Sequence, residues 1–338
     1  MGNTMIGVFI RLFSGIAVFL YGLKMMSMGA ENLVVNVKAE KVSNFVKNPI
    51  CGAITGGLVA GVTQSSVVVS FITVGLVDLG VVSFMSTAPI IMGANVGTTV
   101  TAQIISLSGI GGAIIGAISS IIGLLAGFFK NKYAKGISET AFGLGFIFVG
   151  LSIMDSEISM LTEFLWFKNV FLIKSPFVLF LNGLVMTAIV QSSSAITGIT
   201  IILAGKGLVS FKSAVFITLG SNVGSCFSVI FASMNKSLPA KRASVFNLLF
   251  NLLGAIIFFP FALIFDNFVF NLFMNNAIDV KRAIANFHTL FNLFCALLFL
   301  PFYKLLTKLV AYLVSDPMPI SKENTINKTF TSKSRRFY

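Results

Sequence analysis

Two polar clusters interrupt otherwise apolar stretches of the sequence and carry its clearest potential for chemistry. They read Gln-Ser-Ser at residues 64–66 and Gln-Ser-Ser-Ser at residues 191–194. Serine hydroxyls and glutamine amides can donate hydrogen bonds to an anion without adding charge of their own. Because polar groups are costly inside a membrane, their grouping here predicts a binding site.

Glycine residues flank both clusters and indicate how the chain positions them. Gly56 and Gly61 precede the first cluster, and Gly183 and Gly198 surround the second. This pattern predicts two re-entrant helical hairpins, each turning at its cluster, because non-helical backbone at membrane depth must be buried in protein or line a wet cavity. A half-helix begins at each turn, and its free N–H groups and dipole end attract anions.

A second polar pattern follows each cluster at the same distance. Asn95 lies in Gly-Ala-Asn-Val-Gly-Thr-Thr, and Asn222 lies in Gly-Ser-Asn-Val-Gly-Ser-Cys. Amide, hydroxyl and exposed carbonyl oxygens suit a hard monovalent cation. Gln64 and Gln191 can donate to an anion and accept toward such a cation at once.

The two regions are copies of one another. Aligned without a gap, residues 64–101 and 191–228 share 16 identities in 38 pairs, most of them polar residues or glycines. Upstream, residues 19–26 resemble residues 147–154. An isolated Ser-Ser pair would more often bond the backbone or a neighbouring helix. Repetition at a fixed offset instead favours binding, and it is typical of secondary transporters built from inverted repeats and broken helices.

Composition places the chain in a membrane. Hydrophobic residues make up 56% of the 338 and charged residues 10%, against about 25% charged in soluble domains, and the mean hydropathy is +0.95. Apolar runs close to the ~20 residues that span a bilayer recur at 8–23, 110–129, 245–264 and 287–300. The sequence therefore predicts an all-α polytopic membrane protein with inverted structural repeats, re-entrant helical hairpins and broken helices.

The chain is expected to divide into four parts. These are a first transmembrane repeat at 1–135, a second repeat core with its re-entrant hairpin at 136–235, C-terminal transmembrane helices at 236–314, and a polar basic tail at 315–338.

The net charge of +13 would by itself suit a nucleic-acid partner. The basic residues instead gather in short connections at 130–135 and 236–242 and in the C-terminal tail, as the positive-inside rule describes for cytoplasmic segments. We therefore expect no nucleic-acid partner, a multi-pass protein of the cell inner (plasma) membrane, and a cytoplasmic C-terminus.

Residues that would support enzymatic or proton-coupled chemistry are scarce. No carboxylate stands clearly within an apolar run, where proton relays place one, and this favours a metal cation over a proton as the coupling ion. His288 is the single histidine, and no motif supplies the base that Ser65 or Ser192 would need as a nucleophile. The three cysteines are far apart and give neither a disulfide framework nor metal-ligand spacing. We expect the protein not to be an enzyme.

The paired Gln-Ser-Ser clusters, each followed by Gly-(Ala/Ser)-Asn-Val-Gly-(Thr/Ser), resemble the type II sodium-dependent phosphate cotransporters. The likeness is strongest over residues 52–101 and 179–228. It implies Na⁺-coupled symport of inorganic phosphate into the cell by elevator-like alternating access. The phosphate-binding candidates are then Gln64, Ser65, Ser66, Gln191, Ser192, Ser193 and Ser194. The Na⁺-binding candidates are Gln64, Asn95, Thr98, Thr99, Gln191, Asn222 and Ser225.

Two residues depart from the family pattern. Val67 stands where a third serine would extend the first cluster, and Cys226 replaces the hydroxyl that Thr99 supplies in the first half. A thiol is a poor ligand for a hard cation. Without the resemblance, the residues predict only that the protein transports an anion together with a cation. Another oxyanion or a dicarboxylate as substrate, and a membrane sensor that binds phosphate without moving it, therefore stay open as alternatives.

Overall fold

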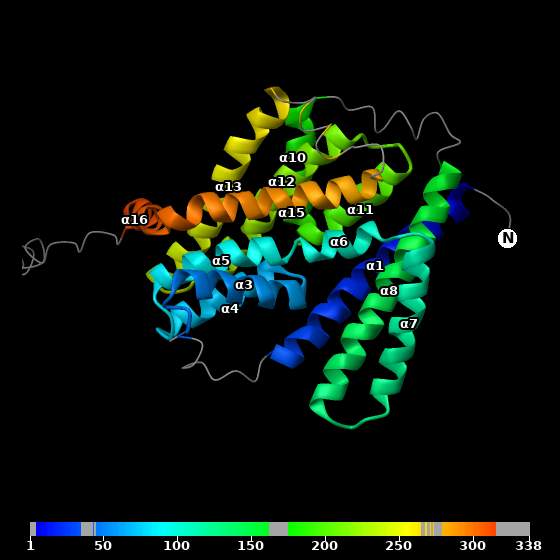
Figure 1. Ribbon diagram of the computed structural model, residues 1–338, viewed down its shortest axis with the longest axis horizontal. Helices are drawn as coiled ribbons and strands as arrows, with labels where there is room; N and C mark the ends of the chain where they lie inside the picture. Colours follow the sequence, from blue (N-terminus) through cyan, green and yellow to red (C-terminus); the bar gives the residue numbers. More distant parts are fainter. Residues whose placement is uncertain are drawn as a thin grey trace, which may run out of the picture.

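The computed structural model describes residues 5–34, 43, 45–161, 175–264, 268, 271, 273 and 279–315. Within these ranges the secondary structure is helical and includes no strand, which confirms the predicted all-α class. With the labels of Figure 1, the helices are α1 (Met5–Val34), α3 (Pro49–Thr63), α4 (Ser66–Asp78), α5 (Phe84–Gly97), α6 (Val100–Ser106), α7 (Ile110–Gly127), α8 (Lys132–Leu161), α10 (Pro176–Val190), α11 (Ser193–Gly205), α12 (Phe211–Ser233), α13 (Leu238–Ile264), α15 (Val280–Phe299), the 3₁₀ turn η1 (Leu300–Phe302) and α16 (Tyr303–Leu313).

Six helical segments of the described chain are long and apolar enough to cross a membrane. They are Met5–Leu33, Phe84–Ser106, Lys132–Leu161, Phe211–Ser233, Leu238–Ile264 and Val280–Leu313. The shortest have 23 residues, and a helix of that length is about 34 Å long, which exceeds the ~30 Å hydrocarbon core of a bilayer. This confirms the predicted polytopic membrane protein.

Two helical hairpins carry the polar clusters at their turns. α3 and α10 have 15 residues each, and their return arms α4 and α11 have 13 each. Helices of 13–15 residues are only about 20–22 Å long, so a single arm is too short to cross the hydrocarbon core. The two hairpins expected from the sequence are therefore present, with matched arm lengths.

Each hairpin packs on the helix that follows it through close backbone contacts. A Cβ added at Gly93 of α5 would collide with the carbonyl oxygen of Ala53 in α3. A Cβ added at Gly220 of α12 would collide with the carbonyl oxygen of Phe180 in α10. The offset between these two contacts is the one that relates Gln64 to Gln191. The sequence repeat is therefore also a packing repeat.

The first half contains a broken helix that the second half lacks. α5 ends at Gly97 and α6 begins at Val100, and between them the N–H of Thr99 bonds the carbonyl of Val96, three residues back. α12 continues unbroken across the equivalent residues, where the Ser225 hydroxyl donates to the carbonyl of Asn222 in its own helix at 2.8 Å. The predicted helix break thus occurs in one half of the described chain.

The helices α1, α7 and α8 form a group beside the hairpins (Figure 1). α1 and α8 are antiparallel, because Gly15 lies against Met154 whereas Gly29 lies against Gly136. Near one end of this pair the Arg11 guanidinium donates to the Glu157 carboxylate at 2.8 Å. α13 and α15 pack on α12 and bury large side chains such as Phe246 and Phe250 in the main core.

The expected division into four parts stays a prediction. Residues 316–338 of the expected basic tail lie outside the described residues.

We predict that Gly220→Ala destabilises the protein by about 1–3 kcal/mol, because the added methyl group forces apart two backbones that touch. Thermal unfolding in detergent, followed by loss of the monodisperse peak, measures this effect. Gly75→Ala is the matched control, because a Cβ at Gly75 meets nothing within 4 Å. Equal unfolding temperatures for the two variants would contradict the proposed packing role.

Candidate substrate and ion site

The two hairpin turns meet at a cavity of about 380 Å³. It is lined by residues 63–68 of the first hairpin, residues 190–194 of the second, Thr98 at the helix break, and one face of α1 between Leu20 and Glu31. All seven residues expected to bind phosphate lie on its walls. The tertiary structure thus brings together two clusters that are far apart along the chain.

Both turns are made by a glutamine in the left-handed conformation. Gln64 has φ 54° and ψ 28°, and Gln191 has φ 60° and ψ 23°. Among the described residues they are the two non-glycine residues with positive φ. This conformation costs roughly 1–2 kcal/mol for a residue with a Cβ. Glycine would avoid that cost, so the glutamine side chain at both turns points to a role in binding.

The residue after each glutamine caps the helix that returns. The Ser65 hydroxyl accepts from the N–H of Val68, and the Ser192 hydroxyl accepts from the N–H of Ala195, each at 3.2 Å. Each hydroxyl keeps its own hydrogen available for a ligand. The first turns of α4 and α11 line the cavity, so the unpaired N–H groups and positive dipole ends of two helices meet at one space.

Four oxygens from three segments gather next to this cavity. The carbonyl oxygen of Gln64 lies 3.4 Å from the Thr98 hydroxyl, 3.5 Å from the Thr101 hydroxyl and 3.3 Å from the Ser194 hydroxyl. Ser194 is also 3.4 Å from Thr101 and 3.5 Å from Thr98. These separations are long for hydrogen bonds between oxygens, which cluster at about 2.7–2.8 Å.

The spacing of these four oxygens suits a hard cation. Oxygen ligands about 2.4 Å from a cation, within the range known for Ca²⁺, lie about 3.4 Å apart when they subtend a right angle. Na⁺ has nearly the same ionic radius as Ca²⁺ and prefers the same neutral oxygen ligands. The described residues contain no group of three or more His, Cys, Asp or Glu that could hold a metal ion, so a transition-metal site is not indicated there.

Four of the residues expected to bind Na⁺ do not line the cavity, namely Asn95, Thr99, Asn222 and Ser225. The amide of Asn95 donates to the carbonyl of Ile91 at 2.9 Å, and the Thr99 hydroxyl donates to the carbonyl of Val96 at 2.7 Å. Asn222 donates to Asn292 at 3.0 Å. As noted above, Ser225 bonds within α12. These four side chains are occupied by helix and helix–helix bonds in this conformation.

The two halves are not equivalent at the oxygen cluster. By the repeat, Ser194 corresponds to Val67, whose side chain has no oxygen, and Thr98 corresponds to Ser225. Cys226 is fully buried and its thiol lies 3.5 Å from the carbonyl of Asn247, away from the cavity. Because Val67 has no side-chain oxygen, the described residues form the four-oxygen cluster around the carbonyl of Gln64 and not around that of Gln191.

His288 has a packing role in this conformation. It is 2% exposed, and its Nε2 lies 3.2 Å from the side-chain oxygen of Asn222. It does not line the cavity. The bond joins α15 to α12, as expected for a polar group that links membrane helices.

α1 also contributes to the cavity, and the sequence alone did not predict this contribution. Lys24, Ser27 and Glu31 line the cavity beside the hairpin turns, and the Ser27 hydroxyl donates to the Glu31 carboxylate at 3.3 Å. The three residues are spaced by three and four positions, so they form a polar stripe along one face of an apolar helix. That periodicity was the available signal, but which neighbours the stripe faces depends on tertiary packing.

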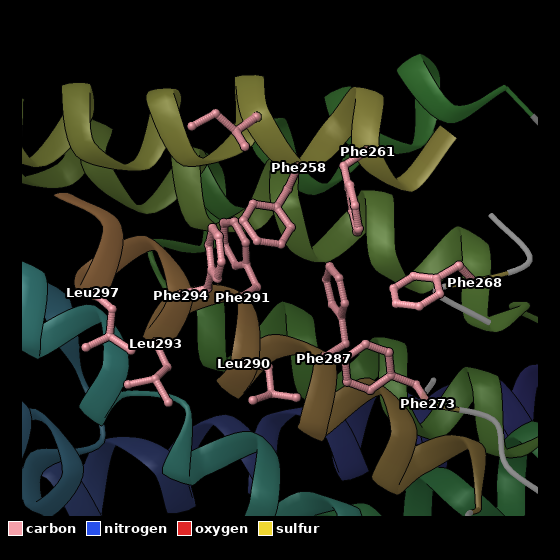
Figure 2. A pocket seen from close by; sticks show the side chains of 11 residues that line it. Phe258, Phe261, Phe268, Phe273, Phe287, Leu290, Phe291, Leu293, Phe294 and Leu297 are labelled. Atoms are coloured by element: carbon pink, nitrogen blue, oxygen red, sulfur yellow. The ribbon is translucent and has the colours of Figure 1, made fainter. Parts of the chain in front are cut away.

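A second cavity, of about 410 Å³, lies between α13 and α15, and the described residues that line it are all apolar (Figure 2). Aromatic rings dominate its walls, with the ring centroids of Phe258 and Phe291 4.9 Å apart. Leu297 on its rim is 64% exposed. Because a binding site for a polar ligand needs some convergent polar groups, this groove is not a phosphate site, and its apolar surface suits lipid chains.

A polar cavity between two half-length hairpins, within a bundle of membrane-length helices, defines the class as a membrane transporter. Residues 18–156 and 168–293 match the family model described as Na+/Pi-cotransporter, and the chain belongs to that family. It is a family of transporters and not of enzymes, which agrees with the sequence interpretation. Family membership thus supports phosphate transport.

Several curated proteins are similar to this chain. "Uncharacterized protein YqeW" of Bacillus subtilis (strain 168) is 31% identical over 272 residues, covering 80% of this chain and 86% of the relative. "Putative inorganic phosphate export protein YjbB" of Escherichia coli (strain K12) is 25% identical over 259 residues, covering 75% of this chain and 46% of the relative. "Sodium-dependent phosphate transport protein 2A" of Rattus norvegicus is 40% identical over 67 residues, covering 20% of this chain and 10% of the relative. No solved structure matches.

We predict that Gln191→Gly keeps or raises the stability of the protein, by up to about 1 kcal/mol, because glycine adopts the left-handed turn without the Cβ penalty. Gln191→Ala keeps that penalty and should be no more stable than the wild type. Both variants should lose phosphate-dependent thermal stabilisation, since both lack the amide. A Gln191→Gly protein that still responds to phosphate would remove this side chain from the site.

Proposed function

We propose that this chain is a secondary active transporter that moves inorganic phosphate together with Na⁺ through the cytoplasmic membrane. The observation that carries the proposal is the meeting of the two serine-capped hairpin turns at one cavity, with the four-oxygen cluster on its wall. The phosphate-binding candidates are Gln64, Ser65, Ser66, Gln191, Ser192, Ser193 and Ser194.

Phosphate recognition would use neutral donors. Two helix N-termini and the serine hydroxyls converge on the cavity, and such groups bind phosphate oxygens through hydrogen bonds and helix dipoles. A substrate that carries one to two negative charges still needs positive charge nearby.

Sodium would supply part of that charge at the oxygen cluster. We propose that Na⁺ binds between the carbonyl of Gln64 and the hydroxyls of Thr98, Thr101 and Ser194. Gln64 and Ser194 belong both to this cluster and to the cavity wall, so a cation there would lie close to a bound anion. Each ion would then raise the affinity for the other, which is the coupling that symport requires. Asn95, Thr99, Gln191, Asn222 and Ser225 stay candidates for other conformations.

We further propose that the two hairpins are inverted and enter the membrane from opposite faces. Asp78, at the end of α4, bonds Lys236 at 3.1 Å and the N–H of Ser237 at 2.8 Å, in a connection that the positive-inside rule assigns to the cytoplasm. Lys206, at the end of α11, pairs instead with Asp155 at 2.7 Å, near the opposite end of α8 from the basic connection at 130–135. Arg242, at the end of that basic connection, donates to the carbonyl of Val314 at 2.9 Å, and this contact supports a cytoplasmic C-terminus.

The cavity follows the C-terminal half of α1, whose end lies beside the start of α8 and its basic connection. On this proposal the conformation is open toward the cytoplasm. The Lys206–Asp155 ion pair would then help to close the opposite side, and an elevator-like movement of the hairpins against α1 and α8 would exchange the two openings. With an inward Na⁺ gradient, symport carries phosphate into the cell.

Transport is tested by radiolabelled phosphate uptake into proteoliposomes with Na⁺, K⁺ or H⁺ gradients in parallel. We expect accumulation above equilibrium with the Na⁺ gradient alone, because the oxygen cluster suits Na⁺ in size and charge. Gln191→Ala protein, reconstituted at equal density, is the control for leak.

Four other results would contradict the proposal. Accumulation driven by H⁺ would exclude sodium coupling. Movement of sulfate or a dicarboxylate in place of phosphate would change the substrate. Phosphate binding without uptake or exchange would favour a sensor. Phosphate movement opposite to the Na⁺ gradient would favour export.

We predict that Thr101→Val raises the Na⁺ concentration for half-maximal uptake by about fivefold, the effect of losing an interaction worth ~1 kcal/mol. Thr101 belongs to the oxygen cluster but does not line the cavity, so the half-saturating phosphate concentration at saturating Na⁺ should stay near the wild-type value. The control is Thr55→Val, whose hydroxyl donates to the carbonyl of Cys51 in its own helix. An unchanged Na⁺ dependence in Thr101→Val would exclude this cluster as the sodium site.

A further inference from the structure

The cavity contains one full positive charge from the protein. Among the described residues on its wall, Lys24 is the single basic one and Glu31 is the single acidic one. The remaining lining side chains are apolar, hydroxyl or amide groups. Any electrostatic preference of the described site for an anion therefore depends on helix dipoles, a bound cation and this one ammonium group.

Lys24 lies at a depth where a charge is costly in lipid. α1 has 30 residues, and its midpoint falls between Phe19 and Leu20. Lys24 is then about 7 Å along the axis from the middle of the helix, inside a ~30 Å hydrocarbon core if α1 is centred in it. Charged residues at such depth face a bundle interior or a water-filled cavity and usually have a partner. Lys24 faces the cavity between the hairpin turns.

Within the described part of the chain, the Lys24 ammonium group has no ion-pair or hydrogen-bond partner. No carboxylate there lies within 4.0 Å of its ammonium group, and no hydrogen bond from it is found. Glu31 is seven residues further along α1, about 10 Å in rise, and accepts from Ser27 at 3.3 Å. The donors of Lys24 therefore stay available to a ligand.

Four other cations of the described helices have partners within the protein. Arg11 pairs with Glu157, Lys206 pairs with Asp155, and Arg282 donates to the side chain of Gln103 at 3.0 Å. Lys281 donates to the hydroxyl of Ser108 at 3.1 Å. Lys24 differs from all four in facing the candidate substrate cavity without a protein partner.

The Lys24 ammonium group has no charged counterpart at the equivalent position of the second half. In the alignment of residues 19–26 with 147–154, Lys24 corresponds to Ser152. Ser152 lines a different cavity, together with Asp155 and Ser108. The second half therefore offers no ammonium group to replace Lys24, and removing Lys24 should not be masked by its repeat counterpart.

We propose that Lys24 binds the phosphate directly and supplies the protein's own positive charge at the substrate site. This inference rests on the proposed function and adds a residue to it. The ammonium group would donate to a phosphate oxygen held by the serine clusters, while Na⁺ would bind at the oxygen cluster. Together the two cations would balance a phosphate that carries one to two negative charges. The ammonium group stays with the protein when the anion leaves.

The test compares Lys24→Gln and Lys24→Ser, which remove the charge, with Lys24→Arg, which keeps it. Two readouts use purified protein: exchange of labelled phosphate across proteoliposomes with equal Na⁺ on both sides, and thermal stabilisation by inorganic phosphate in detergent. Lys308→Gln is the matched control, because Lys308 is an exposed lysine on α16 that does not line the cavity.

We expect both charge-removing variants to raise the half-saturating phosphate concentration about tenfold or more, the effect of losing a charged hydrogen bond. Their maximal exchange rate should change much less. Lys24→Arg should restore most of the affinity, and Lys308→Gln should match the wild type. Size-exclusion profiles and the unfolding temperature without phosphate show whether each variant is folded.

Wild-type half-saturation in Lys24→Gln and Lys24→Ser would overturn the proposal. A fall in maximal rate at unchanged phosphate affinity would also overturn it, because that result indicates a structural or conformational role. Failure of the proposed function is distinguishable, since the wild type itself would then show neither phosphate exchange nor phosphate-dependent stabilisation.

Discussion

Backbone that reverses direction inside a membrane leaves N–H and carbonyl groups without helical partners, and the protein must satisfy them. This requirement is met at Gln64 and Gln191 by side chains that are also suited to ions. Ser65 and Ser192 cap the helices that return from the turns. Hydroxyls of Thr98, Thr101 and Ser194 surround the carbonyl of Gln64. The groups that make the turns possible are therefore the groups that we propose to bind phosphate and Na⁺.

Close backbone packing holds each hairpin against the helix that follows it. α3 lies on α5 and α10 lies on α12, and the contacts at Gly93 and Gly220 leave no room for a side chain. Hairpin and following helix thus form a unit in each half. Contacts of the hairpin ends with the surrounding helices include single ion pairs, such as Lys206 with Asp155. Each hairpin and its following helix therefore form a tightly packed unit that contacts the surrounding helices partly through single ion pairs. This arrangement suits a transporter in which the hairpins move against α1 and α8.

The charge distribution explains why coupling is useful at this site. The described cavity wall combines neutral donors with one ammonium group, Lys24, and one carboxylate, Glu31, which do not form an ion pair. A phosphate in such a place gains from a cation that arrives with it and leaves with it. On the proposed function, neutral hydroxyls together with a transient Na⁺ would make the affinity for phosphate depend on the Na⁺ gradient.

Much of this architecture could be predicted from the sequence because its signals are local. Hydropathy predicted the all-helical membrane class, because burial in a membrane depends on residue type. Glycines around the Gln-Ser-Ser clusters predicted the two hairpins, because backbone geometry at a turn also depends on residue type. The repeat at fixed offset indicated that the clusters act together. The sequence offered no base near the serines, and His288 lies between α12 and α15, where its Nε2 is 3.2 Å from the side-chain oxygen of Asn222.

Tertiary structure alone decided which polar residues face the same space. Asn95, Asn222 and Ser225 match the repeat as well as Thr98 does, yet their side chains bond within or between helices. At the helix break, Thr98 and Thr101 instead lie near the carbonyl of Gln64. Lys24 belongs to a helix far from either cluster in sequence, and only the packing of α1 brings it to the cavity. The local sequence indicates which ligands a side chain can bind, but long-range packing determines which residues and which cavity that side chain faces.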